Sequence, residues 1–228
     1  MKSNKKQTTK TETIVIFGAH PDDEAIGPGG TIAKFAQENK RVVVVLFTQG
    51  EGSHPFHKKH IITTKRRKEA TKCAELLGVA ELHHWDYRDG KLTKDLQNPK
   101  VTQRIITLLQ KERPTKIFTH ARDDLLYPDH TAVHRAVINA VDIYNTKYTT
   151  QKVEVYTFNI WWLTFRNRNT PQLCVDITRT FHIKQQALDV FQSQKVALIQ
   201  LWPTVIIKAI IHGLQKKTRF AENFYKIR

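Results

Sequence analysis

Cysteine is scarce in this sequence: Cys73 and Cys174 are the only two in 228 residues, and they lie far apart. A disulfide framework needs several cysteines in a regular pattern, and a Cys-rich zinc site needs thiolates at short spacing. Neither is supported, and the composition fits the reducing cytoplasm. The first residues lack the apolar stretch of a secretory signal, and no internal repeat or low-complexity linker is visible. We therefore expect a cytoplasmic protein.

Acidic residues are also few, since 21 Asp and Glu face 37 Lys and Arg, which gives a net charge of +16 and a pI near 9.9. This charge predicts attraction to an anionic partner, whether nucleic acid, anionic lipid or a phosphorylated sugar. The basic residues are scattered over predicted helix faces and ends, without interleaved aromatic residues or a nucleic-acid motif. We therefore favour solvated surface charge and expect no specific nucleic-acid partner.

With 40% hydrophobic residues, the chain is long enough for one domain with a substantial core. Residues 1–12 are polar and rich in Lys and Thr, which predicts a disordered basic tail. We expect residues 13–228 to form a single domain with a helical carboxy-terminal part.

Predicted strands and helices alternate along most of the chain. Residues 42–47 are apolar without a break, which is typical of a central strand covered on both faces by helices. The alternation predicts an α/β fold: a Rossmann-like, doubly wound, mostly parallel sheet flanked by helices. The expected strands are 13–18, 41–48, 81–85, 116–119, 153–156 and 173–176, and the expected helices are 31–40, 61–77, 101–111, 131–144 and 178–194.

Residues 196–214 form the longest apolar segment, close to the length of a membrane span. Gln200, Pro203, Lys208 and His212 interrupt it. We interpret it as a bent helix that is buried or lies at an interface, and a membrane span is the alternative.

The most informative stretch is Ala19 to Glu24, with the sequence AHPDDE. It follows an apolar strand and precedes a glycine-rich segment, so it lies where a buried strand turns into a helix. Ligands of open α/β sheets bind in the crevice outside the carboxyl ends of the strands. A pair of helix-capping Asp residues beside a surface His would be the structural alternative. A second stretch, Asp129-His130, follows a later predicted strand and favours a functional site.

Together these two loops supply His20, Asp22, Asp23 and His130, which is a His/Asp/His ligand set with a spare carboxylate. Three protein ligands with one open position are typical of catalytic zinc, so we expect one Zn²⁺ per chain. His20 and Asp23 are three residues apart, so one tight turn can direct both at an ion. Asp22 is then free to act as general base on a water activated by the metal. The set predicts metal-assisted hydrolysis, most naturally of an amide.

Four stretches resemble the zinc-dependent N-acetylglucosaminyl de-N-acetylase family, which includes the phosphatidylinositol-glycan, mycothiol and bacillithiol pathway deacetylases. The resemblance implies that His20, Asp23 and His130 bind zinc and that Asp22 is the base. It also implies that Arg66 and Asp89 hold the sugar. Two alternatives stay open: Arg66 pairs with Glu69 on its own helix, or Asp89-Gly90 is only a turn. The stretches are Phe17 to Gly30, Arg66 to Gly78, Pro128 to His130 and Phe220 to Phe224.

One departure from the family pattern concerns the second motif, where His-Pro-Asp-His is replaced by Tyr127-Pro128-Asp129-His130. The first His of that motif helps to stabilise the oxyanion, and the Asp steadies it. In this chain Asp129 has lost that partner and is expected to serve as a helix cap. Tyr127 is the candidate oxyanion donor, with packing over the loop as its alternative. His134 is a second candidate, with an ordinary surface or core His as its alternative.

We therefore predict a hydrolase that removes the N-acetyl group from an N-acetylglucosamine-type sugar in a conjugate. The basic surface and the apolar 196–214 segment favour an anionic or lipid-linked acceptor and peripheral membrane contact. Two alternatives remain: an amidase that uses the same site on a non-sugar amide, and a catalytically weak protein that binds an acetylated glycan.

Overall fold

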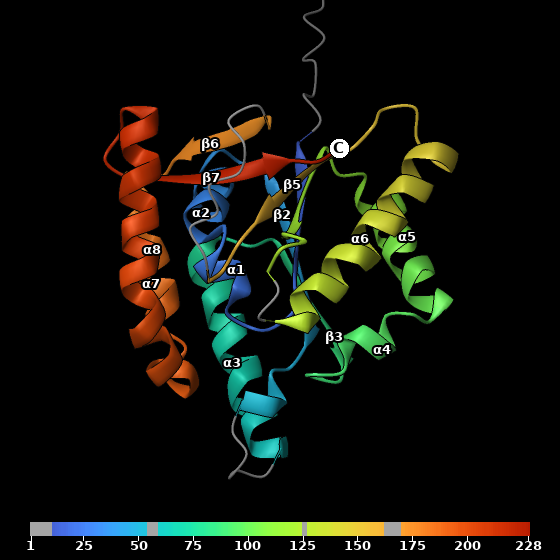
Figure 1. The fold of residues 1–228 in the computed structure, drawn as a ribbon, viewed down its shortest axis with the longest axis horizontal. Helices are drawn as coiled ribbons and strands as arrows, with labels where there is room; N and C mark the ends of the chain where they lie inside the picture. The colour runs from blue at the N-terminus through green and yellow to red at the C-terminus, as the bar shows by residue number, and fades with distance from the viewer. Residues whose placement is uncertain (1–10, 54–58, 125–126, 162–169) are drawn as a thin grey trace, which may run out of the picture.

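The computed structural model of the chain describes residues 11–53, 59–124, 127–161 and 170–228. Most of the expected basic tail lies outside these ranges. The described part is built around one seven-stranded sheet with helices on both faces (Figure 1).

The strand order of the sheet is β3-β2-β1-β4-β5-β7-β6. The first five strands are parallel, whereas β7 is antiparallel to both of its neighbours, β5 and β6. The predicted fold class, a Rossmann-like and mostly parallel α/β sheet, is confirmed. The strands are β1 Thr13–Gly18, β2 Arg41–Thr48, β3 Glu81–Tyr87, β4 Lys116–His120, β5 Glu154–Phe158, β6 Gln172–Asp176 and β7 Ala221–Lys226.

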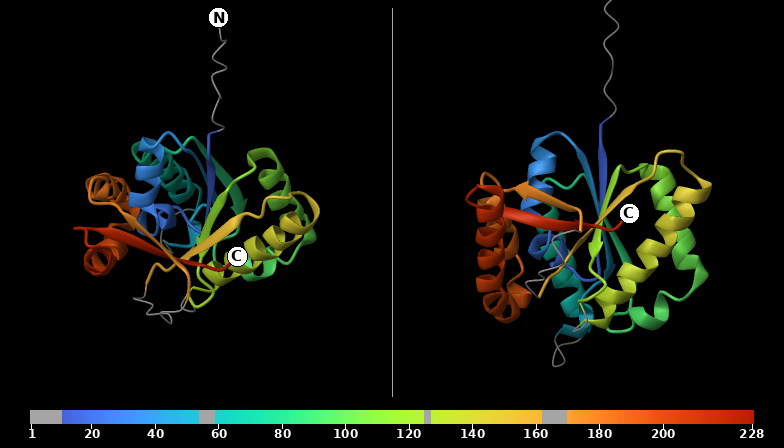
Figure 2. Two further views of the ribbon diagram at one scale, coloured as in Figure 1. Left: turned by 90° about the horizontal axis from the view of Figure 1, so that it is seen from above. Right: turned by 45° about the horizontal axis from the view of Figure 1, so that its top comes forward.

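Two layers of helices cover the sheet. One layer contains α2, α3, α7 and α8, and the other contains α5 and α6 (Figure 2). The helices are α1 Asp23–Ile26, α2 Gly29–Gln37, α3 Lys59–Leu77, α4 Leu92–Asp95, α5 Pro99–Glu112, α6 Pro128–Lys147, α7 Phe181–Asp189 and α8 Lys195–Lys216, with 3-10 turns at Glu51–Ser53 and Gln192–Gln194.

Strand β2 illustrates why the central strands are apolar throughout. Its side chains alternate between the two layers, so that Val42 and Val44 pack under α2 and α3 while Val43 and Val45 pack under α5 and α6. All four are fully buried. Because both faces are covered, the positions between the end residues Arg41 and Thr48 favour apolar side chains.

A buried ion pair joins the carboxy-terminal strand to the start of α2. The carboxylate of Glu222, on β7, accepts hydrogen bonds from the backbone N–H groups of Gly30 (3.0 Å) and Thr31 (2.8 Å). The Lys184 ammonium, on α7, donates to Glu222 Oε1 at 2.6 Å. Glu222 therefore satisfies helix donors that have no partner within the helix. Lys184 also donates to the carbonyls of Ile26 (2.8 Å) and Gly27 (3.0 Å).

The carboxy-terminal region differs most from the prediction. Strand β7 was not predicted, and the helix expected over 178–194 ends at Asp189. The apolar segment is a single helix, α8, that buries one stripe and exposes another, and Pro203 lies within it. By length and composition alone, α8 is the one helix of the described residues that could cross a membrane.

Candidate active site

The predicted site residues meet where β1 and β4, which are neighbours in the sheet, both end. The chain leaves β1 toward β2 on one side and returns to β4 on the other, so this is the switch point at which open α/β sheets bind ligands. A cavity of about 460 Å³ opens there. Besides the predicted residues it is lined by Trp161 and by α8 residues, among them Leu198 and Leu201.

Asp23 is the centre of the first motif and is almost fully buried. Its Oδ2 accepts hydrogen bonds from the N–H groups of Ala19 (2.9 Å) and His20 (2.8 Å). Its Oδ1 lies 3.5 Å from His130 Nε2. The turn that aims it places Asp22 at φ 120°, a backbone conformation that costs an L-residue free energy. This strain is located at the residue predicted to be the base.

His20 faces three carboxylates. Its Nδ1 lies 3.7 Å from Asp23 Oδ2, and its Nε2 lies 3.1 Å from Asp89 Oδ1 and 3.5 Å from Asp129 Oδ2. Burial opposes protonation of His20, but hydrogen bonds to Asp129, Asp23 and Asp89 raise its pKa well above the ordinary value. The surroundings of His20 therefore favour a positive charge.

His130 is oriented by Asp124, a residue that the sequence analysis missed. Its Nδ1 lies 2.8 Å from Asp124 Oδ2, and both side chains are buried. This contact leaves Nε2 directed at Asp23. A carboxylate on the far nitrogen is the usual arrangement for a histidine that binds a metal. The only signal in the sequence was that Asp124 follows a strand neighbouring the first motif.

His120 is a second residue that was missed, although it ends β4. It is fully buried, its Nε2 lies 3.1 Å from Asp23 Oδ2, and its ring stacks on His130 at 3.9 Å between centroids. Burial and the neighbouring His130 lower the pKa of His120 to about 4. His120 is therefore neutral at pH 7 and fixes Asp23 without adding charge.

His20, Asp23 and His130 fit a metal ion. Each offers one ligand atom, and the three atoms lie within 4.8 Å of one another. Ligand atoms around a tetrahedral zinc are separated by about 3.3 Å, close to the 3.5 Å between His130 Nε2 and Asp23 Oδ1. Each His also has a carboxylate at its other nitrogen. The donor set therefore suits an ion that accepts both imidazole and carboxylate.

Asp22 lies beside this group and is held by a buried arginine. Arg66, on α3, donates to Asp22 Oδ2 at 3.1 Å and to the carbonyl of Pro21. Burial raises the pKa of Asp22 to about 6, although Arg66 opposes the shift. Burial, and then the charge of Asp22, raise the pKa of Glu24 to about 8, so Glu24 is protonated at neutral pH. Arg66 thus contacts the candidate base directly.

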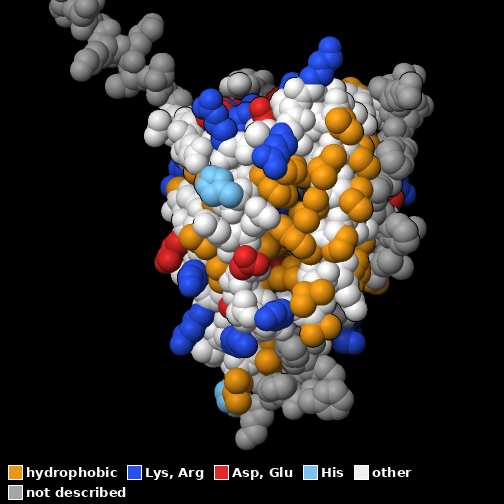
Figure 3. Space-filling view, turned by 90° about the vertical axis from the view of Figure 1, so that its left-hand side faces the viewer, with side chains coloured by type: hydrophobic (Ala, Val, Ile, Leu, Met, Phe, Trp, Pro, Cys, Tyr) orange, Lys and Arg blue, Asp and Glu red, His pale blue; other side chains and the backbone are white. Residues whose placement is uncertain are grey.

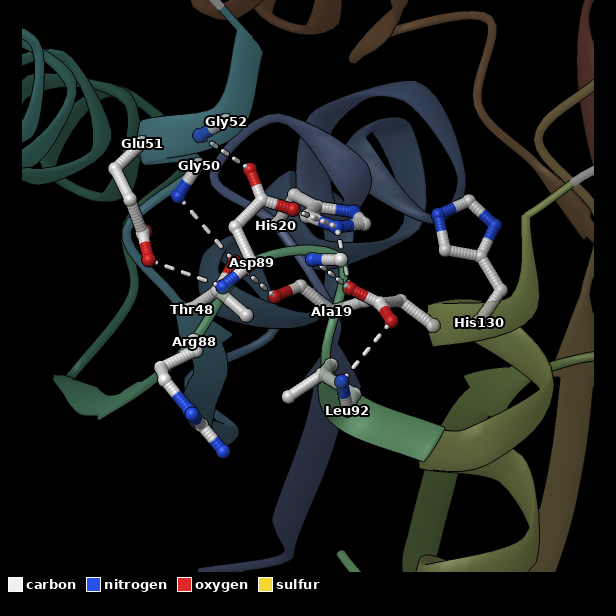
Figure 4. A network of polar contacts seen from close by, with 12 residues as sticks. Ala19, His20, Thr48, Gly50, Glu51, Gly52, Arg88, Asp89, Leu92 and His130 are labelled. Carbon is white, nitrogen blue, oxygen red and sulfur yellow. Dashed lines mark hydrogen bonds and ion pairs between the residues drawn. The ribbon is translucent and has the colours of Figure 1, made fainter. Parts of the chain in front are cut away.

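Asp89 and Asp129 connect loops to the site. Asp89 Oδ2 accepts from the N–H of Gly52 at 2.9 Å, which holds the loop after β2 against His20 (Figure 4). Asp129 accepts from the N–H groups of Gly90 (2.7 Å) and Leu92 (3.1 Å). Asp89-Gly90 is therefore more than a surface turn.

The expectation that Asp129 caps α6 is wrong. The helix begins at Pro128, three residues before the predicted start at residue 131, and its N-cap is Tyr127. Proline fits the first helical position because it has no N–H group to satisfy there. The Asp129 carboxylate is consequently directed away from the helix end, toward the loop after β3 and His20.

Tyr127 is extended, as expected before a proline, with φ −125° and ψ 92°. Its ring lies between those of His130 (5.1 Å between centroids) and Trp161 (5.0 Å, nearly parallel), and it lines the cavity. His134, the other candidate donor, has its Nδ1 2.8 Å from the carbonyl oxygen of His120. Of the two, Tyr127 is the residue that borders the cavity.

Comparison with known proteins adds independent information. The family described as PIG-L, GlcNAc-PI de-N-acetylase, matches residues 15–141. The diacetylchitobiose deacetylase of Thermococcus kodakarensis is 30% identical over 223 residues, which cover 92% of this chain and 80% of the relative.

Two solved structures share the fold. The N,N'-diacetylchitobiose deacetylase of Pyrococcus horikoshii has a TM-score of 0.79 at 24% identity and covers 96% of this chain and 84% of its own. The 4-carboxy-2-hydroxymuconate hydratase of Pseudomonas putida KT2440 also reaches 0.79 at 20% identity and covers 96% and 97%. Since a hydratase shares it, the fold alone does not identify the reaction.

Proposed function

Because this chain belongs to the PIG-L (GlcNAc-PI de-N-acetylase) family, we propose that it is a zinc-dependent hydrolase that removes the N-acetyl group from an N-acetylglucosamine-type sugar in a conjugate. The resemblance predicted from the sequence is confirmed, and the chain is a metal-dependent N-deacetylase. The observation that best supports zinc-dependent removal of an N-acetyl group is the grouping of His20, Asp23 and His130 beside Asp22 in one cavity.

His20, Asp23 and His130 would hold the metal ion. Two imidazoles with one carboxylate suit zinc better than magnesium or calcium, which prefer oxygen ligands throughout. When bound, such an ion supplies a Lewis acid that polarises an acyl oxygen and makes a water acidic. Asp124, through its contact with His130, and Asp89, through its contact with His20, would keep the two imidazoles oriented.

Asp22 is the proposed general base. It would take a proton from the attacking water and return it to the nitrogen of the leaving amine. A pKa of about 6 supports this role, since the group is ionised at neutral pH yet remains basic enough to accept a proton. Arg66 would hold the carboxylate in place across the 3.1 Å contact.

Tyr127 is the proposed oxyanion donor. A phenol is neutral and protonated at pH 7, so it can donate to the developing negative charge. Asp129 would support the site indirectly through His20. Asp89 and Arg66 both line the cavity, and they remain the proposed contacts of the sugar.

The acceptor to which the sugar is attached is proposed to be anionic or lipid-linked. The net charge of +16 supports an anionic group, and the apolar α8 side chains at the cavity support an apolar one. A cytoplasmic location stays a prediction.

The experiment compares Asp22→Asn with Asp23→Asn in the purified chain. Zinc content is measured by elemental analysis, and acetate release is measured on a panel of N-acetylglucosamine conjugates that includes diacetylchitobiose. Asp22→Asn should retain one zinc and lose about two to four decades of rate, whereas Asp23→Asn should lose the zinc.

The opposite pattern of zinc retention would reverse the assignment of ligand and base. Wild-type protein that binds zinc but releases acetate from none of the conjugates would refute the sugar substrate. Activity on a simple acetamide under the same conditions would then favour a non-sugar amidase.

A further inference from the structure

Helix α8 presents a continuous apolar stripe to the surface, which we call the α8 outer face. Its members recur every three or four residues and therefore lie on one side of the helix. Val196 is 76% exposed, Leu214 is 73% exposed, and no charged residue interrupts the stripe between them (Figure 3). Soluble surfaces rarely carry such a patch without a partner. The face comprises Val196, Ile199, Pro203, Ile207, Ile210 and Leu214.

The fold does not need this face, because α8 is held by its opposite side. Leu201, Val205 and Ala209 are buried against the sheet layer. Gly213 packs so closely that an added Cβ would lie 2.6 Å from the carbonyl oxygen of Arg219. A helix fixed in this way cannot leave the domain to cross a bilayer without opening the core.

Lysine 208 fixes the helix further, next to the cavity. Its ammonium donates to the carbonyls of Asn159 (3.1 Å) and Ile160 (2.9 Å). Ile160 lines the candidate active site, as do Ala197 and Leu198 from the first turns of α8. The outer face and the catalytic cavity therefore belong to one rigid part of the molecule.

The charges within α8 and at its two ends are positive, and one carboxylate from a neighbouring helix, that of Asp189 on α7, borders the groove beside Ile199. Residues 190–221 contain no Asp or Glu but five Lys or Arg. Four of these are exposed at the two ends of α8: Lys195 at the start, and Lys216, Lys217 and Arg219 at the end. A second copy of this chain would bring a like-charged rim against the first, whereas an anionic lipid surface would complement it.

We propose that the α8 outer face docks onto an anionic phospholipid surface with the helix lying in the plane of the headgroups. The aliphatic side chains enter the boundary between headgroups and acyl chains, while the terminal lysines and Arg219 reach lipid phosphates. Docking would place the first turns of α8, which also line the catalytic cavity, next to the membrane. The proposal does not depend on the deacetylase reaction.

The experiment measures sedimentation of the full chain with vesicles of phosphatidylcholine alone and of phosphatidylcholine mixed with phosphatidylglycerol. Partitioning to the anionic vesicles should be stronger by about tenfold or more at low salt, and it should weaken as salt rises. Ile207→Ser combined with Leu214→Ser should weaken binding by about tenfold or more, because both exposed side chains lose their apolar contact.

A matched control is Ile61→Ser combined with Leu76→Ser, which alters two exposed apolar residues of α3 (50% and 38% exposed) and should leave binding unchanged. A second test variant, Lys216→Gln with Lys217→Gln, changes no apolar contact and should weaken binding only to the anionic vesicles. Unchanged deacetylation of a soluble substrate and unchanged melting show that the variants are folded.

Several results would overturn the proposal. They are no binding to either vesicle, equal binding to both, or equal losses in the test and control variants. Resistance of the bound chain to alkaline extraction would indicate a span. A dimer in solution that Ile207→Ser with Leu214→Ser dissociates, without vesicle binding, would instead assign the face to a second copy.

Discussion

Two buried groups of charges in this molecule behave in opposite ways. The pair of Lys184 and Glu222 is complete within the protein: the lysine meets three oxygens, and the carboxylate meets that lysine and two backbone N–H groups. The group at the ends of β1 and β4 is incomplete. Buried polar atoms there have no hydrogen-bond partner among the described residues, namely Glu24 Oε1, Asp124 Oδ1 and His120 Nδ1.

This difference in hydrogen bonding distinguishes the structural pair of Lys184 and Glu222 from the group of charges at the candidate active site. A buried pair with all its hydrogen bonds adds to the free energy of unfolding only as long as both partners remain. The site group instead crowds carboxylates around His20 and Asp23, and its repulsion is relieved when a cation binds. Burial alone is therefore a poor guide to function, and the crowding of several carboxylates around one histidine is the better one.

The largest expected effect comes from removing a ligand. His130→Ala should abolish tight zinc binding and reduce deacetylation below even the Asp22→Asn variant, because the ion and its chemistry are lost together. Chelation should lower the melting temperature of wild-type protein, since binding at 100 times Kd stabilises the fold by about 2.7 kcal/mol. His130→Ala should not respond to chelator. A variant that still binds zinc tightly would contradict the ligand assignment.

Breaking the structural pair should affect stability and leave the metal in place. Glu222→Gln leaves Lys184 buried without a counter-charge, which should cost about 3–5 kcal/mol of unfolding free energy in urea titrations. The zinc stoichiometry of the folded variant should remain unchanged. Combining Glu222→Gln with Lys184→Met should recover part of the loss, because the unpaired charge is gone. Loss of zinc at full stability would show that the two groups are coupled.

Tyr127 is expected to give a smaller change, confined to the rate. Tyr127→Phe keeps the ring between His130 and Trp161 and deletes only the hydroxyl, so turnover should fall about a hundredfold with zinc content unchanged. His134→Phe, measured alongside, should fall much less because His134 contacts a backbone carbonyl. A decrease below about threefold, or 0.7 kcal/mol, for Tyr127→Phe would leave the ring with a packing role only.

The smallest expected effect comes from Glu12, a carboxylate near the surface. Its contribution to the free energy of unfolding can be compared with those of the two buried groups of charges. Burial opposes ionisation of Glu12, but hydrogen bonds from Lys116, Thr115 and Lys40 lower its pKa from 4.5 to about 2. Its contribution to stability is therefore present above pH 4.5 and is lost as the pH falls toward 2. Because Glu12 is partly exposed, the contribution should stay below about 1 kcal/mol. Glu12→Gln should flatten the pH dependence of urea unfolding in this window, and an unchanged slope would contradict the assignment.

Most of the first half of the fold could be predicted from the sequence. Strands β1 and β2 begin and end at the predicted residues because they are buried on both faces, and burial leaves an unbroken apolar pattern. Strand β7 could not be predicted in this way. Its mixed sequence AENFYK acquires its place only by pairing with β5 and β6.

The site shows the same limit. The members of the first motif are neighbours in sequence, so the sequence pattern reveals them. His120 acts on Asp23 from a strand 97 residues further along the chain, where no spacing rule applies. Asp124 lies only six residues before His130, but no motif connects the two residues. The wrong cap role of Asp129 has a similar cause, because its actual partners, Gly90 and Leu92, come from a distant loop.

The position of β7 also determines when the sheet can be completed as the chain is synthesised. It follows all other described strands in the chain, yet it lies between β5 and β6, which do not pair with each other. Until residues 221–226 emerge, β6 has no neighbour and α2 lacks the carboxylate of Glu222. Helix α2, which follows the first motif and α1, therefore receives its Glu222 contact only after residues 221–226 have joined the sheet, so the start of this helix is fixed late in folding although it lies early in the sequence.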